Sequence, residues 1–182
     1  MPGKVSKKKT AVMIIAFRDF KDEEYFFSKE VLEKAGVEIV TASDELGTAI
    51  GVSGAEAEVD LFIEDLTVEN FDAIIFIGGP GALKHLDNEV SYNIAQEALS
   101  RDKVLGAICI SPVILAKAGV LKEKKATVWS DALDKSPIRI LENNGAIYDS
   151  EDVVIDGKIV TANGPAAAEA FGEALVEVLQ EK

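Results

Sequence analysis

The chain has 182 residues, of which 48% are hydrophobic, and this length and composition favour one domain with a sizeable core. Acidic residues outnumber basic ones by 32 to 19, and the net charge of −13 argues against nucleic-acid binding, which depends on basic contacts to phosphate. The single cysteine excludes an intramolecular disulfide. Because His85 is the single histidine of the chain, we also expect no metal site and no cofactor.

The N-terminus is basic, with lysines at positions 4, 7, 8 and 9. We predict a solvated tail over residues 1–9 and a single domain over residues 10–182. The apolar run 11–17 has no small-residue cleavage site and continues into charged sequence, so we interpret it as a buried strand. It is too short to cross a bilayer, and we expect a cytoplasmic protein with no membrane partner.

Strand-like and helix-like segments alternate along the chain. The predicted strands are 11–17, 37–42, 71–77, 104–109 and 126–129, with hairpins over 48–61 and 153–162. The predicted helices are 23–35, 90–99, 112–118, 137–143 and 165–179, and Gly36 stands where a helix C-terminus would need it. This alternation predicts an α/β fold with a mostly parallel sheet and helices on both faces.

Three polar or glycine-rich segments follow predicted strands. They are residues 18–24 after the first strand, residues 78–81 (Gly-Gly-Pro-Gly) after the middle strand, and Cys109 at the end of another. Ligands of such sheets bind beyond the carboxyl ends of the strands. We therefore expect these segments to converge on one crevice.

Cys109 stands directly before a predicted helix start. In the sequence Cys109-Ile110-Ser111-Pro112, Ser111 is suited to cap the helix and Pro112 to occupy its first position. The positive end of the helix would lower the thiol pKa from its usual value near ~8.5 and make the cysteine reactive. The alternative is a buried, inert cysteine at the end of a core strand.

The other two segments have ordinary explanations as well as functional ones. The glycine turn 78–81 could present backbone amides to an oxyanion, or it could simply be a tight turn. It is neither a Walker loop nor a dinucleotide fingerprint. The acids within residues 20–24 are expected at a helix start for dipole reasons alone.

The chain resembles the ThiJ/PfpI superfamily over residues 10–179. Residues 20–24 (Phe-Lys-Asp-Glu-Glu) match the family segment F-x-D-x-E, in which Glu24 is the acid that faces the cysteine. Residues 77–81 resemble the glycine turn after the central strand, and residues 107–112 (Ala-Ile-Cys-Ile-Ser-Pro) resemble the nucleophile turn. Residues 163–165 fit the start of the last helix.

The resemblance implies a flavodoxin-like three-layer sandwich. It also implies that Cys109 and Glu24 are catalytic, with Glu24 protonated and hydrogen-bonded to the thiolate. The backbone amides of Gly79 and Ile110 would be the oxyanion donors, with Gly78 and Ser111 completing the binding site. Members of the superfamily usually form dimers, and some build hexamers, so we expect a homodimer or a higher homo-oligomer. The aromatic residues 25–27 could serve such an interface or pack on the sheet.

The departures from the family pattern bear on function. Peptidase-like members carry a histidine directly after the cysteine, where this chain has Ile110. Some redox-sensor members take a histidine from a later segment, which here is 127–130 (Thr-Val-Trp-Ser). Ser111 replaces a glycine, and Asn163 replaces an arginine. No family position supplies a histidine base, and it stays open whether His85 or a partner subunit does.

These features favour cofactor-independent chemistry on small reactive carbonyls, of the glyoxalase or deglycase kind, through a Cys109 thiolate and a protonated Glu24. One alternative is an intracellular protease or amidase, which the isoleucine at position 110 makes less favourable, because hydrolysis normally needs a base and an acid besides the thiolate. Another is a non-enzymatic redox sensor or chaperone that acts through oxidation of Cys109.

Overall fold

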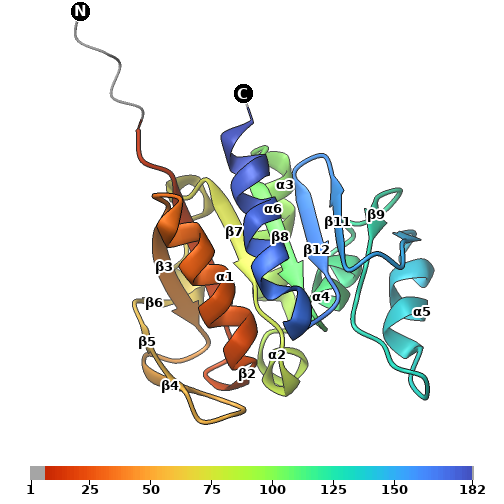
Figure 1. Ribbon diagram of the computed structural model, residues 1–182, viewed down its shortest axis with the longest axis horizontal. Coiled ribbons are helices and arrows are strands. Elements are labelled where there is room, and N and C mark those ends of the chain that lie inside the picture. Colours follow the sequence, from red (N-terminus) through yellow and green to blue (C-terminus); the bar gives the residue numbers. More distant parts are fainter. Residues whose placement is uncertain (1–6, 182) are drawn as a thin grey trace, which may run out of the picture.

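The computed structural model describes residues 7–181, and within them seven strands form the main sheet (Figure 1). The strand order is β11-β12-β8-β7-β1-β3-β6, and every neighbouring pair is parallel except β11 with β12. The bounds are β1 Thr10–Ile15, β3 Glu38–Ser43, β6 Leu61–Phe62, β7 Ala73–Phe76, β8 Val104–Ile108, β11 Val153–Asp156 and β12 Ile159–Ala162. The predicted α/β class with a mostly parallel sheet is confirmed.

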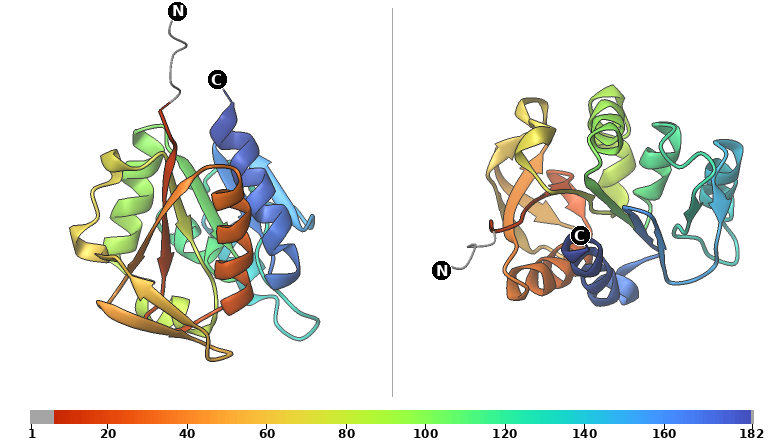
Figure 2. Two further views of the ribbon diagram at one scale, coloured as in Figure 1. Left: turned by 60° about the vertical axis from the view of Figure 1, so that its left-hand side comes forward. Right: turned by 90° about the horizontal axis from the view of Figure 1, so that it is seen from above.

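Helices cover both faces of this sheet. Figure 2 shows α1 and α6 side by side on one face, with α3 and α4 on the other. The helices are α1 Asp22–Lys34, α2 Pro80–His85, α3 Glu89–Ser100, α4 Pro112–Lys117, α5 Ser136–Asn143 and α6 Ala168–Gln180, with 3-10 turns at Ile63–Asp65, Val68–Asn70 and Pro165–Ala167. None of these helices is both long and apolar enough to span a bilayer.

Strand β1 divides the core into two halves because side chains alternate across a sheet. Val12 and Ile14 pack into the core beneath α3 and α4. Ala11, Met13 and Ile15 pack into the core beneath α1 and α6. All five side chains are fully buried. The uninterrupted apolar run that indicated a strand in the sequence therefore reflects burial on both faces.

Two small sheets flank the main one. The first joins β2 (Arg18–Phe20), β4 (Gly47–Gly51) and β5 (Glu56–Val59), and it contains the first predicted hairpin. The second pairs β9 (Lys125–Ala126) with β10 (Ile147–Tyr148).

Several sequence-based boundaries were wrong. The strand predicted over 126–129 is only the two-residue β9, whose backbone pairs with another short strand instead of joining the main sheet. Strand β8 ends at Ile108, one residue before the predicted end. The sequence missed β2 and the short helix α2, which begins inside the glycine turn. Of the predicted basic tail, residues 1–6 lie outside the described part, and residues 7–9 are exposed.

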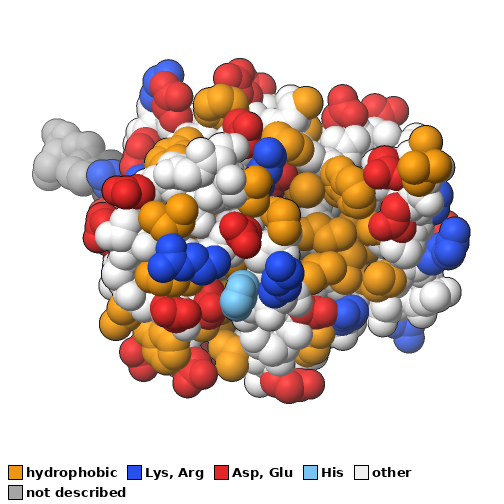
Figure 3. All heavy atoms as spheres, turned by 90° about the horizontal axis from the view of Figure 1, so that it is seen from below, with side chains coloured by type: hydrophobic (Ala, Val, Ile, Leu, Met, Phe, Trp, Pro, Cys, Tyr) orange, Lys and Arg blue, Asp and Glu red, His pale blue; other side chains and the backbone are white. Residues whose placement is uncertain are grey.

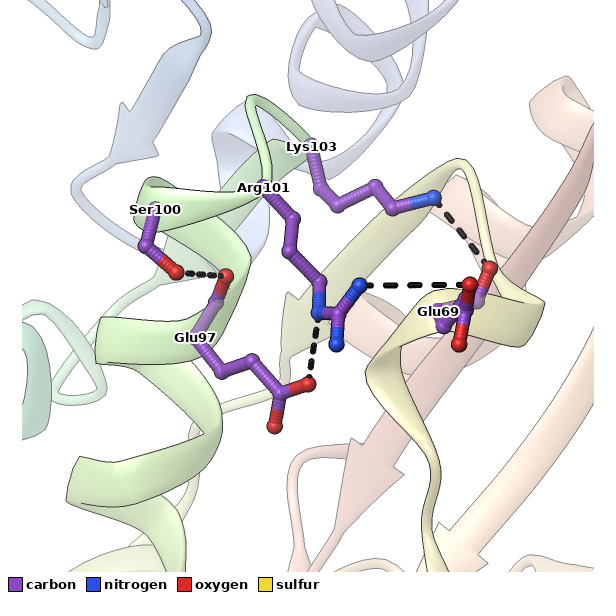
Figure 4. Close-up of polar contacts among 5 residues, drawn as sticks. All are labelled: Glu69, Glu97, Ser100, Arg101 and Lys103. Atoms are coloured by element: carbon purple, nitrogen blue, oxygen red, sulfur yellow. Dashed lines mark hydrogen bonds and ion pairs between the residues drawn. The ribbon is translucent and has the colours of Figure 1, made fainter.

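A polar cluster joins the end of α3 to the turn Val68–Asn70, at the amino ends of the strands (Figure 4). Arg101 pairs with Glu97 at 2.7 Å and reaches Glu69 at 4.0 Å. Lys103 Nζ donates to the Glu69 carbonyl at 3.3 Å, and Ser100 Oγ donates to the Glu97 carbonyl at 2.9 Å. Exposed pairs of this kind add little stability.

Helix α1 is anchored to β3 by a buried hydroxyl pair. The hydroxyls of Tyr25 and Thr41 lie 2.7 Å apart, and both residues are almost fully buried. Tyr25 follows Glu24 directly, so this contact also fixes the first turn of the helix. Of the aromatic residues 25–27, Tyr25 therefore serves packing, whereas Phe27 is 43% exposed.

We predict that Tyr25→Phe lowers the free energy of unfolding by about 1–3 kcal/mol, because the Thr41 hydroxyl is left buried without a partner. Urea unfolding of Tyr25→Phe, of Thr41→Val and of the double variant measures the coupling free energy between the two hydroxyls. The double variant should lose less than the sum of the singles. Strict additivity would contradict a direct hydroxyl contact.

Candidate active site

Cys109 occupies a sharp turn between β8 and α4. Its φ is +63°, a conformation that residues with a side chain rarely adopt. Two backbone hydrogen bonds hold it there: its N–H donates to the Ala162 carbonyl at 2.9 Å, and its carbonyl accepts from the Trp129 N–H at 2.8 Å. The turn is therefore held by two segments that are remote in sequence.

Glu24 lies in the first turn of α1 and is fully buried. Its Oε2 accepts a hydrogen bond from the Gly78 N–H at 2.9 Å, and its Oε1 is buried with no partner that meets hydrogen-bond geometry. A Cβ placed on Gly78 would lie 2.6 Å from Cys109 Cβ and 2.7 Å from Glu24 Oε2. The structure thus brings Glu24, Gly78 and Cys109 together at the carboxyl ends of the strands, as the topology predicted.

The neighbouring acids have other partners. The Asp22 carboxylate accepts from the N–H groups of Ser53 and Ala55, both at 2.9 Å, and so holds the turn of the β4–β5 hairpin. Glu23 forms an ion pair with Lys21 at 3.4 Å. Of the three consecutive acids, Glu24 alone turns toward the cysteine.

Burial has the largest influence on the pKa values of Glu24 and Cys109. It raises the pKa of Glu24 from 4.5 to about 7, although interactions with Cys109, Gly78 and Lys21 each lower it. Burial and the negative charge of Glu24 raise the pKa of the Cys109 thiol, and the backbone amides of Ile110 and Gly79 only partly oppose this. The pair therefore loses one proton near neutral pH and strongly resists losing a second.

The expected lowering of the Cys109 pKa by the helix was wrong. Desolvation of the sulfur and the negative charge of Glu24 raise the thiol pKa, and the amides of Ile110 and Gly79 at this turn oppose the rise only in part. Ser111 does not cap the helix either. Its hydroxyl donates to the Ile77 carbonyl at 2.7 Å, which ties the cysteine turn to the end of the central strand. Pro112 occupies the first helical position, as predicted.

A pocket of about 460 Å³ opens at Cys109. Its walls are mainly apolar, and the described residues that line it are Lys21, Gly79, Pro80, Leu83, Cys109, Ile110, Trp129 and Pro165. Figure 3 views this edge of the molecule from below, where hydrophobic side chains gather among scattered charged ones. Sequence reasoning missed the lining roles of Lys21 and Leu83, because each depends on how separate loops fold back over the sheet.

Comparison with known proteins identifies the family of the chain. The family model described as the DJ-1/PfpI family matches residues 9–178. The chain belongs to the DJ-1/PfpI family. It is 36% identical to an uncharacterised protein of Methanocaldococcus jannaschii, covering 96% of this chain and 84% of that one. It is 31% identical to a protein of Pyrococcus horikoshii named as a deglycase, covering 93% and 99%.

Solved structures show the same relationship. The crystal structure of a ThiJ/PfpI domain protein from Brachyspira murdochii matches with a TM-score of 0.89 and 32% identity. The match covers 96% of this chain and 98% of that one. The DJ-1/PfpI architecture, with its mostly parallel sheet between helices, is therefore established for this chain.

This DJ-1/PfpI member has no histidine among the described residues that line its pocket. Ile110 lines the pocket directly after Cys109. Thr127 is fully buried, and its N–H donates to Thr161 Oγ1 at 3.0 Å. His85 ends α2 and lies 3.5 Å from Asp44, outside the lining of the pocket. Likewise, no group of three or more His, Cys, Asp or Glu side chains in residues 7–181 is placed to hold a metal ion.

We predict that Glu24→Gln stabilises the protein above neutral pH. Between pH 4.5 and about 7 the unfolded chain loses the Glu24 proton while the folded chain keeps it. The unfolded state then binds fewer protons, so the free energy of unfolding falls as pH rises, by about 3 kcal/mol in total for this group. Urea unfolding from pH 4 to pH 8 should show this fall in the wild type and not in Glu24→Gln.

The exposed Glu33→Gln, on the same helix, is the matched control and should follow the wild type. If the difference between wild type and Glu24→Gln did not change with pH, Glu24 would not be a buried acid with a raised pKa.

Proposed function

We propose that the protein converts small 2-oxoaldehydes into 2-hydroxy acids without a cofactor, with Cys109 as nucleophile and Glu24 as the proton carrier. The observation that carries the proposal is the convergence of Cys109 and Glu24 on Gly78, at one end of a largely apolar pocket. The proposed reaction needs no histidine, and the described residues that line the pocket include none.

The reaction begins with one proton transfer within the pair. The Cys109 thiol passes its proton to the Glu24 carboxylate, and the thiolate adds to the aldehyde carbon and forms a C–S bond. Glu24 returns the proton to the new alkoxide, which gives a hemithioacetal. The backbone amides of Gly79 and Ile110, which lie against the sulfur, are suited to stabilise negative charge at this centre.

Glu24 then acts a second time. Its carboxylate takes the proton from the former aldehyde carbon and, through an enediol, delivers it to the neighbouring carbonyl carbon. The hydroxyl proton of the first carbon moves to the oxygen of the second in the same interconversion. The first carbon is thereby oxidised to a thioester and the second is reduced to an alcohol, so no external oxidant is needed. Water hydrolyses the thioester, releases the 2-hydroxy acid and restores the thiol.

Two further observations support the proposal. A carboxyl group with a pKa of about 7 exists in both forms near neutral pH, as an acid–base shuttle requires. The relative from Pyrococcus horikoshii carries the name deglycase. A protease or amidase is less favoured, because the position after the nucleophile is Ile110, whose side chain cannot exchange a proton.

We predict that purified protein forms lactate from methylglyoxal and that Cys109→Ala abolishes this. Glu24→Gln should lower kcat/KM by roughly 100-fold or more, as expected on losing a general acid–base group. The wild-type rate should rise with pH through about 7, as the Cys109–Glu24 pair loses its first proton. Lactate is measured with lactate oxidase.

His85→Asn is the matched control and should retain activity, because His85 lies outside the pocket. Equal lactate formation by the wild type and Cys109→Ala would refute the proposal. A strong loss in His85→Asn would show that the base had been assigned to the wrong residue.

Redox sensing by Cys109 is the second candidate. The amides of Gly79 and Ile110 lie against the sulfur, where they would also stabilise a sulfinate. We predict that mild peroxide adds two oxygen atoms to Cys109 in the wild type and that Glu24→Gln slows this addition. Intact-mass spectrometry measures the gain, and an unmodified Cys109 would count against this role.

A further inference from the structure

One residue that lines the pocket at Cys109 has a charged side chain that the proposed reaction does not use. Among the described residues that line it, Lys21 carries the only formally charged side chain. The other walls are apolar or backbone, and include Leu83, Ile110 and Trp129. An ammonium group beside apolar walls is poorly screened, so its attraction for an anion is stronger there than in bulk water.

The backbone of Lys21 is tied to the site. Lys21 stands directly before α1, and its N–H donates to the Gly78 carbonyl at 2.9 Å. Gly78 is the residue on which Cys109 and Glu24 converge. The charge of Lys21 also reaches the site, because it favours the ionised form of Glu24.

The ammonium is only weakly engaged elsewhere. Its ion pair with Glu23 spans 3.4 Å, and the two side chains are 27% and 39% exposed. Pairs with this exposure contribute little free energy, so an anion in the pocket can compete with Glu23 for Lys21. The whole chain carries a net charge of −13, which makes a local cation the more important for drawing in an anionic molecule.

The size of the pocket points the same way. At about 460 Å³ it lies within the roughly 300–1,000 Å³ of sites that hold drug-sized ligands. A three-carbon aldehyde would leave much of this space unfilled. A substrate with a second polar group could reach Lys21 while its carbonyl lies at the sulfur.

We propose that Lys21 is a specificity-determining residue that binds a carboxylate or phosphate group carried by the carbonyl substrate. That the bound molecule is a substrate rests on the proposed function, whereas the binding of an anion at Lys21 does not. The substrate class is then an aldehyde or 2-oxoaldehyde with an anionic group a few bonds from the reacting carbonyl, and neutral methylglyoxal is a minimal analogue of it.

The test compares two alkylating agents that differ in charge. Iodoacetate and iodoacetamide react alike: the Cys109 thiolate forms the C–S bond and iodide leaves. The ratio of the two rate constants therefore cancels any change in the thiolate population. Cys109 is the single cysteine of the chain, so the loss of free thiol reports this site alone.

Lys21→Met should lower the iodoacetate-to-iodoacetamide ratio by roughly two- to fivefold, the size expected for a partly exposed charge pair. Lys21→Arg should keep the ratio, and Glu23→Gln should raise it. Lys34→Met removes the same charge at the far end of α1, where the side chain is 73% exposed, and should leave the ratio unchanged. Equal ratios in Lys21→Met, Lys34→Met and the wild type would overturn the inference.

Two outcomes separate this inference from the proposed function. If methylglyoxal gives no lactate but the ratio still depends on Lys21, the reaction is wrong and the anion site stands. If lactate forms but the ratio is insensitive to Lys21, the reaction stands and the anion site is wrong. With glyoxylate as probe, protection of Cys109 from iodoacetamide should weaken in Lys21→Met and persist in Lys34→Met.

Discussion

The α-carbon of Gly78 has room for a hydrogen atom but not for a side chain. A Cβ there would overlap Cys109 on one side and Glu24 on the other. Because no side chain intervenes, the Gly78 amide can donate to Glu24 while its carbonyl accepts from Lys21 at the start of α1. One residue therefore joins the helix that carries the acid to the turn that carries the thiol. The site depends on this close approach more than on any single ion pair.

The conformation of Cys109 depends on the same region. A positive φ costs a residue with a side chain about 1–2 kcal/mol, and that cost must be offset by surrounding contacts. Ala162 and Trp129 supply backbone hydrogen bonds from two other segments, and Ser111 adds a bond to the Ile77 carbonyl. The hydroxyl that replaces the family's glycine therefore ties the cysteine turn to the central strand and leaves the reacting groups untouched.

Sequence predicted the convergence of the site because the rule involved is topological. Parallel strands place their carboxyl ends at one edge, so residues 18–24, 78–81 and Cys109 meet whatever the loop details. The roles of individual acids could not be deduced from the residues alone. Asp22 and Glu24 are equivalent by local rules, and their roles differ because the hairpin amides 31 and 33 residues away reach only Asp22. The resemblance to the family, not the spacing, distinguished Glu24.

The errors have a common physical origin. Ser111 follows the local rule for a helix cap, but a carbonyl 34 residues away in sequence takes its hydroxyl instead. The thiol pKa was predicted from the N-terminus of the nearby helix, which acts through the first turn only, whereas burial depends on everything packed around the sulfur. The strand predicted over 126–129 failed for a similar reason. The Trp129 N–H donates to the Cys109 carbonyl and not to a neighbouring strand.

The isoleucine at position 110 changes the electrostatics of the pocket as well as removing a base. A histidine there would bring water and a titratable group to the sulfur, whereas Ile110 adds apolar wall. Apolar walls lower the effective dielectric, which strengthens both the coupling between Cys109 and Glu24 and the field of Lys21. Loss of the histidine therefore favours reactions that need only one mobile proton and a fixed positive charge. Addition of a thiolate to an anionic carbonyl compound is a reaction of that kind.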